Sequence, residues 1–315
     1  MQLTPDRAAL TARLRAAVLS LIGDDGSAAR FGVAVSGGPD SMALLFLAAQ
    51  GFPGRVAAVT VDHGLRAASA DEAAMVARWC ADRGIGHSIL LPDRPMEGNI
   101  QAWARDTRYR LIERWRADAG ADWIMTAHHA DDQLETLLMR LNRGSGVGGL
   151  AGVRARSGSI LRPLLDVRKA TLLALAEAEN LPFVHDPSNA DLRFDRAALR
   201  AALARAPWLD PQAAARSAAA LAEADAALDW SVAALAEAHI QAQGPGWRLD
   251  RTDLPREYLR RLLLVMLTRA DAPAPRGETL DHAIAQALAG RQTSLGDWLL
   301  KGGSSWTLAP APPRR

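Results

Sequence analysis

The first 130 residues alternate between short apolar runs and longer segments with the spacing of a helix. Four runs have the length and composition of buried strands, and they are Phe31–Val35, Arg55–Val61, His87–Leu91 and Asp122–Ala127. The segments between them are typical of helices, and they are Met42–Gln50, Ser69–Arg83 and Ile100–Ala119. This alternation predicts an α/β fold in which helices cover both faces of a parallel sheet. Ligands of such sheets bind beyond the carboxyl ends of the strands, near the switch in strand order.

The pattern changes in the last third of the chain. Residues 211–241 are rich in alanine, with apolar side chains close to helical spacing, and two further helices are predicted after Pro255 and over Thr279–Leu288. The tail from Thr293 to Leu308 is typical of two short strands joined at Lys301-Gly302-Gly303. We therefore expect a smaller, mainly helical domain to follow the α/β domain.

A chain of 315 residues is longer than one typical domain, which agrees with a division in two. We place the first domain at residues 1–205 and the second at residues 206–315, joined around Arg205–Asp210. No apolar run reaches the roughly 20 residues needed to span a bilayer. The first 15 residues lack the apolar core of a signal peptide, so the expected location is the cytoplasm.

The charge and the cysteine content limit the partners and the metal sites that the chain can have. The net charge is +2, and arginine supplies nearly all the positive charge, because Lys169 and Lys301 are the only lysines. Abundant arginine is compatible with a nucleic-acid partner, because guanidinium groups contact phosphates and bases. A genome rich in G and C also produces abundant arginine, so composition alone does not decide between these two explanations. The single cysteine, Cys80, excludes an internal disulfide and a cysteine-based metal or iron–sulfur site.

The glycine-rich segment Ser36-Gly37-Gly38-Pro39-Asp40-Ser41 joins the first predicted strand to the first predicted helix. Such a junction directs backbone N–H groups and the positive end of a helix dipole at one point, which suits a phosphate. The glycines permit close backbone approach, the serines add hydroxyl donors, and Asp40 offers a carboxylate for Mg²⁺. No Gly-Lys-Ser/Thr follows, so this is not a Walker A loop. An ordinary βα turn is the plainer alternative.

A second constellation lies in Thr126–Thr136, at the end of the fourth predicted strand. If a helix begins at His128, then His128, Asp132 and Glu135 follow at i, i+4 and i+7 and share one face. One imidazole and two carboxylates can hold a cation, bind a substrate ammonium or move a proton near neutral pH. The alternative is a solvated acidic first turn that the helix dipole stabilises.

A third cluster, Gln101–Tyr109, sets Arg105 and Arg108 one helical turn apart. Guanidinium groups beside a nucleotidyl group in transfer would stabilise the negative charge that develops at phosphorus. An exposed arginine face on a surface helix explains either residue equally well.

The order of these segments resembles that of the tRNA(Ile)-lysidine synthases, a family of PP-loop ATP pyrophosphatases. The matching landmarks are Ser36–Ser41, Val61–Arg66, Arg105–Tyr109, Thr126–Thr136, Arg143–Gly146, Arg162–Leu165 and Asp186–Arg200. The resemblance implies a Rossmann-like PP-loop domain that binds ATP and Mg²⁺. It also implies a two-step reaction, in which ATP adenylates C2 of the wobble cytidine of an isoleucine tRNA with a CAU anticodon and L-lysine then displaces AMP to form lysidine.

The resemblance also implies roles for single residues. The implied ATP-binding residues are Ser36, Gly37, Gly38, Pro39, Asp40 and Ser41. The implied catalytic residues are Asp40, Arg108, His128, Asp132 and Glu135, of which Asp40 and Asp132 would hold Mg²⁺. Lysine or tRNA would meet Asp132, Arg196 and Arg200, and the second domain would bind tRNA. One departure weakens the last assignment, because Ala197 stands where the family usually has asparagine after Arg196.

Two other functions stay open at this point. Another PP-loop enzyme that modifies tRNA is the nearer one, although a thiolase generally needs more cysteines than Cys80, and no glutaminase signature supports an ammonia-using synthetase. A nucleotide-binding sensor without catalysis is the more distant one, and it would not need the acidic cluster or a second domain. The oligomeric state also stays open, a homodimer included.

Overall fold

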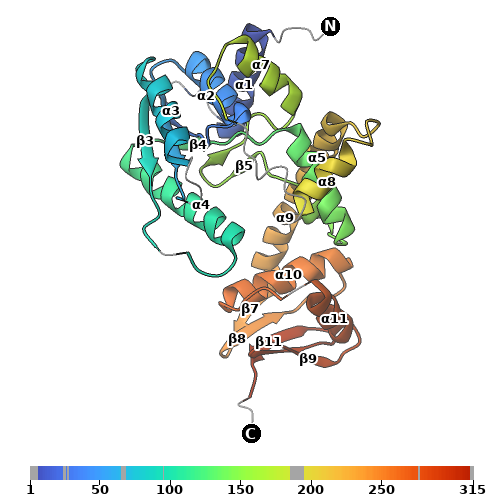
Figure 1. The fold of residues 1–315 in the computed structure, drawn as a ribbon. Coiled ribbons are helices and arrows are strands. Elements are labelled where there is room, and N and C mark those ends of the chain that lie inside the picture. The colour runs from blue at the N-terminus through green and yellow to red at the C-terminus, as the bar shows by residue number, and fades with distance from the viewer. Residues whose placement is uncertain are drawn as a thin grey trace. The chain divides into compact units, whose positions relative to one another are not determined.

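The computed structural model describes residues 6–23, 26, 28–64, 69–94, 96–184, 195–275 and 277–312 (Figure 1). The chain divides into two compact units, Met1–Ala222 and Glu223–Arg315, and the division falls within one helix. Each described helix is too short or too polar to span a lipid bilayer.

The first unit is built on a six-stranded sheet with the order β3-β2-β1-β4-β6-β5. The strands are β1 (Phe31–Ala34), β2 (Val56–Val61), β3 (Gly86–Leu90), β4 (Trp123–Met125), β5 (Arg156–Ser157) and β6 (Ile160–Leu161). All neighbours pair in parallel except β5 and β6, which form an antiparallel edge. The order switches between β1 and β4, so the carboxyl ends of these two strands lie side by side. The predicted parallel sheet is confirmed, with strand ends that differ by one or two residues from those expected.

Helices cover both faces of this sheet (Figure 1). They are α1 (Arg7–Ile22), α2 (Pro39–Gly51), α3 (Ser69–Ala81), α4 (Ile100–Asp118), α5 (Ala130–Asn142), α6 (Val147–Leu150), α7 (Lys169–Ala178) and α8 (Asp195–Leu203). The larger core joins α1, α2, α3 and α7 to one face, and a smaller core joins α4 to the other. Gly32 in β1 permits α4 to pack closely against the sheet, because a Cβ there would lie 2.6 Å from both Trp115 and Ile124.

The start of α5 corrects one expectation. The helix begins at Ala130 with His129 as its N-cap, so His128 precedes the helix and does not share a helical face with Asp132 and Glu135. A capping box decides this start: the backbone N–H of Asp132 donates to His129 Nδ1, and the Asp132 carboxylate accepts from the His129 backbone. An imidazole is an uncommon N-cap, and the sequence pattern therefore did not reveal it.

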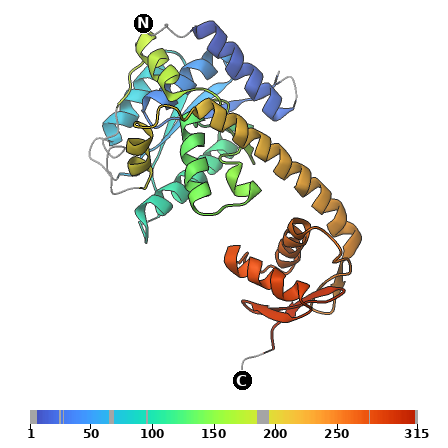
Figure 2. The ribbon, with the colours of Figure 1, turned by 90° about the vertical axis from the view of Figure 1, so that its right-hand side faces the viewer.

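The second unit contains helices α10 (Arg256–Arg269) and α11 (Gly277–Leu288), together with the carboxyl-terminal part of α9 (Pro211–His239). Figure 2 shows α9 as one continuous helix, and it shows α10 and α11 on one face of an antiparallel sheet. The strands have the order β7-β8-β11-β10-β9 and are β7 (Ile240–Gln243), β8 (Gly246–Leu249), β9 (Gln292–Leu295), β10 (Trp298–Lys301) and β11 (Trp306–Pro310). The side chains between the sheet and its helices form a separate core.

The described part of this unit has more residues in helices than in strands, as expected, but it holds more strands than the two predicted for the tail. Two tight turns explain the difference. Gly244 and Gly296, with φ of 58° and 64°, each reverse the chain between strands of only four residues. Strands this short carry too little alternation to be recognised from pattern alone.

Candidate active site

The glycine-rich loop after β1 is organised by Ser41. Its hydroxyl accepts from the backbone N–H of Ser36 (3.2 Å) and donates to the carbonyl of Gly38 (2.9 Å). Gly37 has a φ of 81°, in the left-handed region that favours glycine. Helix α2 starts directly afterwards, with Gly38 as its N-cap, and no side chain caps it. The backbone N–H groups at this helix terminus therefore point towards a place where an anion can bind.

A pocket of about 360 Å³ opens at this point, and we call it the strand-end pocket. Its lining includes Ala34 of β1 and the residues Thr126 and Ala127 that follow β4, which places it at the predicted switch in strand order. Of the predicted site residues, it is lined by Ser36, Gly38, Asp40, Ser41, Arg108, His128, Asp132 and Arg196. Gly37, Pro39, Glu135 and Arg200 do not line it.

The His129 ring lies between the carboxylates of Asp40 and Asp132. The His129 side chain is 5% exposed, with Nε2 at 3.6 Å from Asp40 Oδ2 and Nδ1 at 3.6 Å from Asp132 Oδ2. Burial alone would lower the pKa of His129, but Asp40 and Asp132, helped by Asp131, outweigh burial and raise this pKa above its usual value. The sequence analysis gave a catalytic role to His128 and none to its neighbour His129. The signal that could have found it was its place three residues before Asp132, the spacing of a capping box.

His128 has a different environment. Its Nδ1 lies 3.0 Å from the Thr126 hydroxyl, and the residue lines the strand-end pocket. Burial, together with the charges of Arg162, Arg105 and Arg196, lowers the pKa of His128 to about 4, against the opposing charge of Asp132. The imidazole is therefore neutral near pH 7 and is a weak base there.

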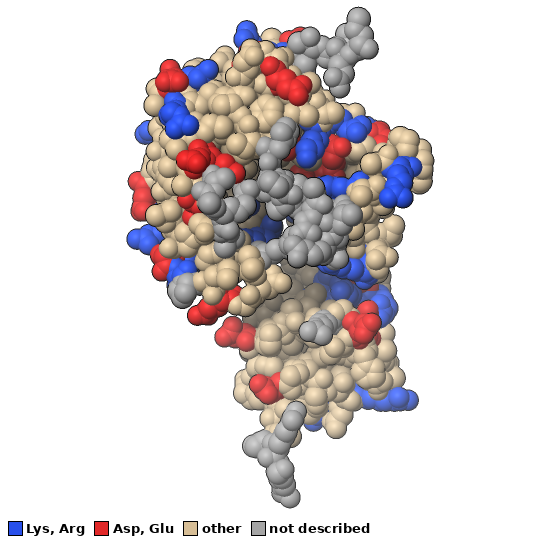
Figure 3. Space-filling model, viewed as in Figure 1, with Lys and Arg blue, Asp and Glu red and all other residues tan. Residues whose placement is uncertain are grey.

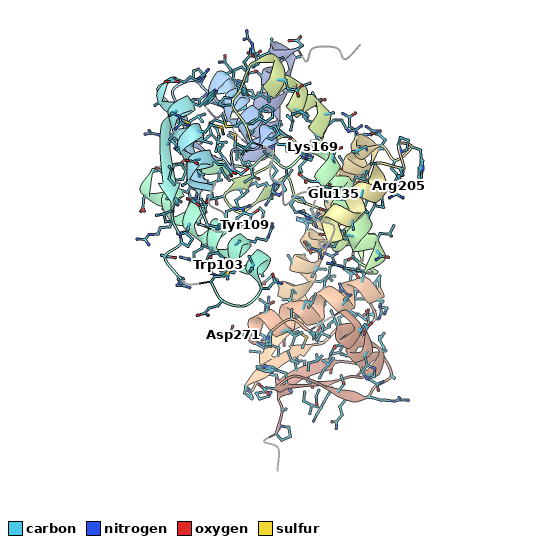
Figure 4. The ribbon with its side chains drawn as sticks, in the orientation of Figure 1. Trp103, Tyr109, Glu135, Lys169, Arg205 and Asp271 are labelled. Atoms are coloured by element: carbon cyan, nitrogen blue, oxygen red, sulfur yellow. The ribbon has the colours of Figure 1, made fainter. Side chains whose placement is uncertain are left out.

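Arg108 brings a positive charge to the pocket from a residue that stays exposed to solvent. Partial desolvation and the charge of Arg105 lower its pKa, and no described carboxylate forms an ion pair with it. A guanidinium at the pocket without an acidic partner among the described residues favours an anionic ligand. Arg105 instead stacks over the Tyr109 ring at 5.0 Å. In Figure 4, Trp103 and Tyr109 lie along α4, the helix that carries both arginines.

Glu135 and Arg200 form an ion pair beside the pocket. Arg200 Nε donates to Glu135 Oε1 at 2.6 Å, and Arg200 Nη2 lies 3.9 Å from Asp132 Oδ1. Glu135 is 4% exposed and is labelled on α5 in Figure 4. From the same helix as Arg200, Arg196 donates to the Thr136 hydroxyl at 3.4 Å. Helix α8 thus brings two arginines to the acidic face of α5.

Other motif residues serve the fold. Gln133 exchanges two hydrogen bonds with the backbone of Val153, and Arg162 donates to the carbonyl of Arg154 at 2.7 Å. Asp131 accepts from the backbone N–H of Lys169 at 2.7 Å, which ties α5 to α7. Two matched segments fall partly outside the described residues, namely 65–66 of the Val61–Arg66 motif and 186–194 of the Asp186–Arg200 motif.

The strand-end pocket offers Mg²⁺ two carboxylates, those of Asp40 and Asp132. Nowhere among the described residues do three or more histidine, cysteine or acidic side chains converge as a ready-made metal cage. Asp40 Oδ1 is nevertheless buried without a hydrogen-bond partner among these residues. Mg²⁺ usually binds one or two carboxylates, substrate phosphates and waters rather than a protein cage, so Asp40 and Asp132 fit such a site. In Figure 3, acidic and basic side chains are interspersed over the visible face.

Comparisons with known proteins agree with this geometry. A family model described as the PP-loop domain matches residues 10–206. The tRNA(Ile)-lysidine synthase of Zymomonas mobilis subsp. mobilis is 41% identical, over 91% of this chain and 90% of that protein. The tRNA(Ile)-lysidine synthase of Novosphingobium aromaticivorans is 43% identical, over 90% of this chain and 89% of that protein.

A solved structure supports the fold. The U34-tRNA thiolase NcsA from Methanococcus maripaludis, with its 4Fe-4S cluster, superposes with a TM-score of 0.55 at 17% identity, over 69% of this chain and 80% of that chain. At this identity the likeness concerns the fold alone. The present chain has one cysteine, Cys80, which is buried in α3 and cannot by itself ligate such a cluster.

Proposed function

The chain belongs to the tRNA(Ile)-lysidine synthase family, and from this premise we propose that it ligates L-lysine to C2 of the wobble cytidine in the isoleucine tRNA with a CAU anticodon. ATP drives the reaction in two steps. The C2 oxygen of the cytidine attacks the α-phosphate of ATP, pyrophosphate leaves, and the oxygen becomes adenylated. The ε-amine of lysine then attacks C2, AMP departs with that oxygen, and lysidine remains.

The strand-end pocket is the observation that carries the proposal. The Ser36–Ser41 loop offers backbone N–H groups and hydroxyls to the phosphates of ATP. Arg108 brings to the same cavity a guanidinium that has no acidic partner among the described residues. Adenylation makes a poor leaving oxygen a good one, so it needs phosphate positioning and charge stabilisation more than a nucleophilic side chain. We assign Arg108 to the negative charge that develops at the α-phosphate.

Asp40 and Asp132 are the residues that would hold Mg²⁺. When bound, the ion would neutralise phosphate charge and align pyrophosphate as a leaving group. Asp40 is the better placed of the two for this task, because it lies within the glycine-rich segment, on the first turn of α2.

The second step needs a lysine side chain that has lost its proton. Asp132 lines the pocket and is the carboxylate that we assign to the lysine ammonium. His128 is less suited to accept the proton, because a pKa of about 4 lies far from that of an amine. We assign His128 to hydrogen bonding with substrate, Glu135 to holding Arg200, and Arg196 to a tRNA or lysine carboxylate contact at the pocket rim.

A reconstituted reaction tests the proposal. Purified protein is incubated with ATP, Mg²⁺, labelled lysine and unmodified isoleucine tRNA, and incorporation of label into tRNA is measured. Asp40→Ala should abolish formation of adenylated tRNA, whereas Asp250→Ala in the second unit should not. Asp132→Asn should raise the lysine concentration that gives half-maximal rate. Tight ATP binding by the wild type without lysine incorporation would favour the nucleotide sensor instead.

A further inference from the structure

His129 links the two junctions that build the strand-end pocket. It follows β4 as the N-cap of α5, and its ring reaches Asp40, which follows β1 on the first turn of α2. Strands β1 and β4 are parallel neighbours, so their carboxyl ends bring these junctions together. The His129 side chain is buried between them, with 5% of it exposed.

The cap determines what the ring offers to Asp40. Nδ1 accepts the backbone N–H of Asp132 at 3.3 Å, so in the neutral ring the proton resides on Nε2. Nε2 also carries a proton when the ring is charged. In either state an N–H therefore faces Asp40 Oδ2, with 3.6 Å between the nitrogen and the oxygen. The other oxygen, Asp40 Oδ1, is buried and accepts no hydrogen bond from the described residues.

We propose that His129 is a positioning residue, which engages Asp40 Oδ2 and thereby directs Oδ1 to the metal–nucleotide complex. The terminal torsion of an aspartate is broad, so a carboxylate without such a partner has no single orientation. The ring also separates Asp40 from Asp132, which would otherwise repel each other across the pocket. This inference rests on the proposed function, because it assumes that Asp40 serves Mg²⁺ and nucleotide.

Two substitutions separate the tasks of the two ring nitrogens. His129→Asn keeps an oxygen near the place of Nδ1 and is a preferred N-cap, but it is too short to reach Asp40. His129→Gln places an amide N–H near the place of Nε2 and weakens the cap. The control is His239→Asn, which removes another histidine–aspartate contact, to Asp250 in the second unit.

Binding of α,β-methylene-ATP is measured by calorimetry with and without Mg²⁺, alongside thermal unfolding. His129→Asn should weaken binding in Mg²⁺ by about 10–100-fold, the usual cost of losing a residue that orients a metal ligand, and change binding without Mg²⁺ little. His129→Gln should bind within about threefold of wild type, with an unfolding midpoint lower by about 2–4 °C from the lost cap. In an Asp40→Asn background, His129→Asn should have no further effect on binding.

Wild-type affinity of His129→Asn in Mg²⁺, or equal losses in both variants, would overturn the positioning role. If His129→Asn does not fold, a 10–100-fold loss in His129→Gln would overturn it as well. Failure of the wild type to bind the analogue would refute the proposed function itself, so the two failures are distinguishable.

Discussion

Arg200→Met tests whether the arginine acts through Glu135 or on substrate. The Glu135 side chain is 5% exposed and that of Arg200 is 31% exposed. Glu135 Oε2 is buried and has no hydrogen-bond partner among the described residues, and Oε1 accepts from Arg200. Removal of the arginine therefore leaves a buried carboxylate without its cation. Breaking a fully buried pair costs about 3–5 kcal/mol, and partial exposure of the arginine reduces this figure, so we expect about 2 kcal/mol. Methionine retains the apolar stem, which limits the loss of packing.

The assay is thermal unfolding combined with lysine transfer to tRNA. A loss of about 2 kcal/mol lowers the unfolding midpoint of a unit this size by about 4–8 °C. Arg200→Met/Glu135→Gln should recover at least half of that loss, because a buried amide costs less than a buried carboxylate. The control is Arg216→Met, which breaks an exposed pair with Asp210 and should shift the midpoint little.

Two results would refute this reasoning: an unchanged midpoint in Arg200→Met, or no recovery in the double variant. If the double variant regains stability and still transfers lysine slowly, Arg200 also contacts substrate. If both properties return together, Arg200 acts by holding Glu135.

Three further predictions concern single residues. Arg108→Met should slow tRNA adenylation by about 100-fold without loss of stability, because it removes a cation that lines the pocket and has no described acidic partner; an unchanged single-turnover rate would contradict this. Gly32→Ala should cost about 1–3 kcal/mol in urea unfolding, because its Cβ would press on the rigid Trp115 ring, and wild-type stability would refute that close packing. Burial raises the pKa of Cys80 to about 11, so Ellman's reagent at pH 8 should modify no thiol in the native protein and one per chain in urea; rapid modification of the native protein would disprove this.

Requirements of residues that are close in sequence account for the features that the sequence alone determined. Alternation of strand and helix predicted the parallel sheet, because each element must bury one apolar face against its neighbours. The anion-binding loop Ser36–Ser41 was recognisable because its requirements, glycine freedom and a helix terminus, are met within six adjacent residues. The same reasoning placed Asp40, His128 and Asp132 at strand ends, where the structure brings them around one pocket.

Tertiary structure decided the partners of these groups. Glu135 and Arg200 are 65 positions apart. No spacing in the sequence shows that α8 packs against α5 or that Arg200 neutralises Glu135. The choice of His129 over His128 as the neighbour of Asp40 depended on which residue caps α5 and on β4 lying beside β1. Contacts between segments distant in sequence depend on three-dimensional packing. A hydrophobic period or a short motif reflects only the requirements of residues that are close together along the chain.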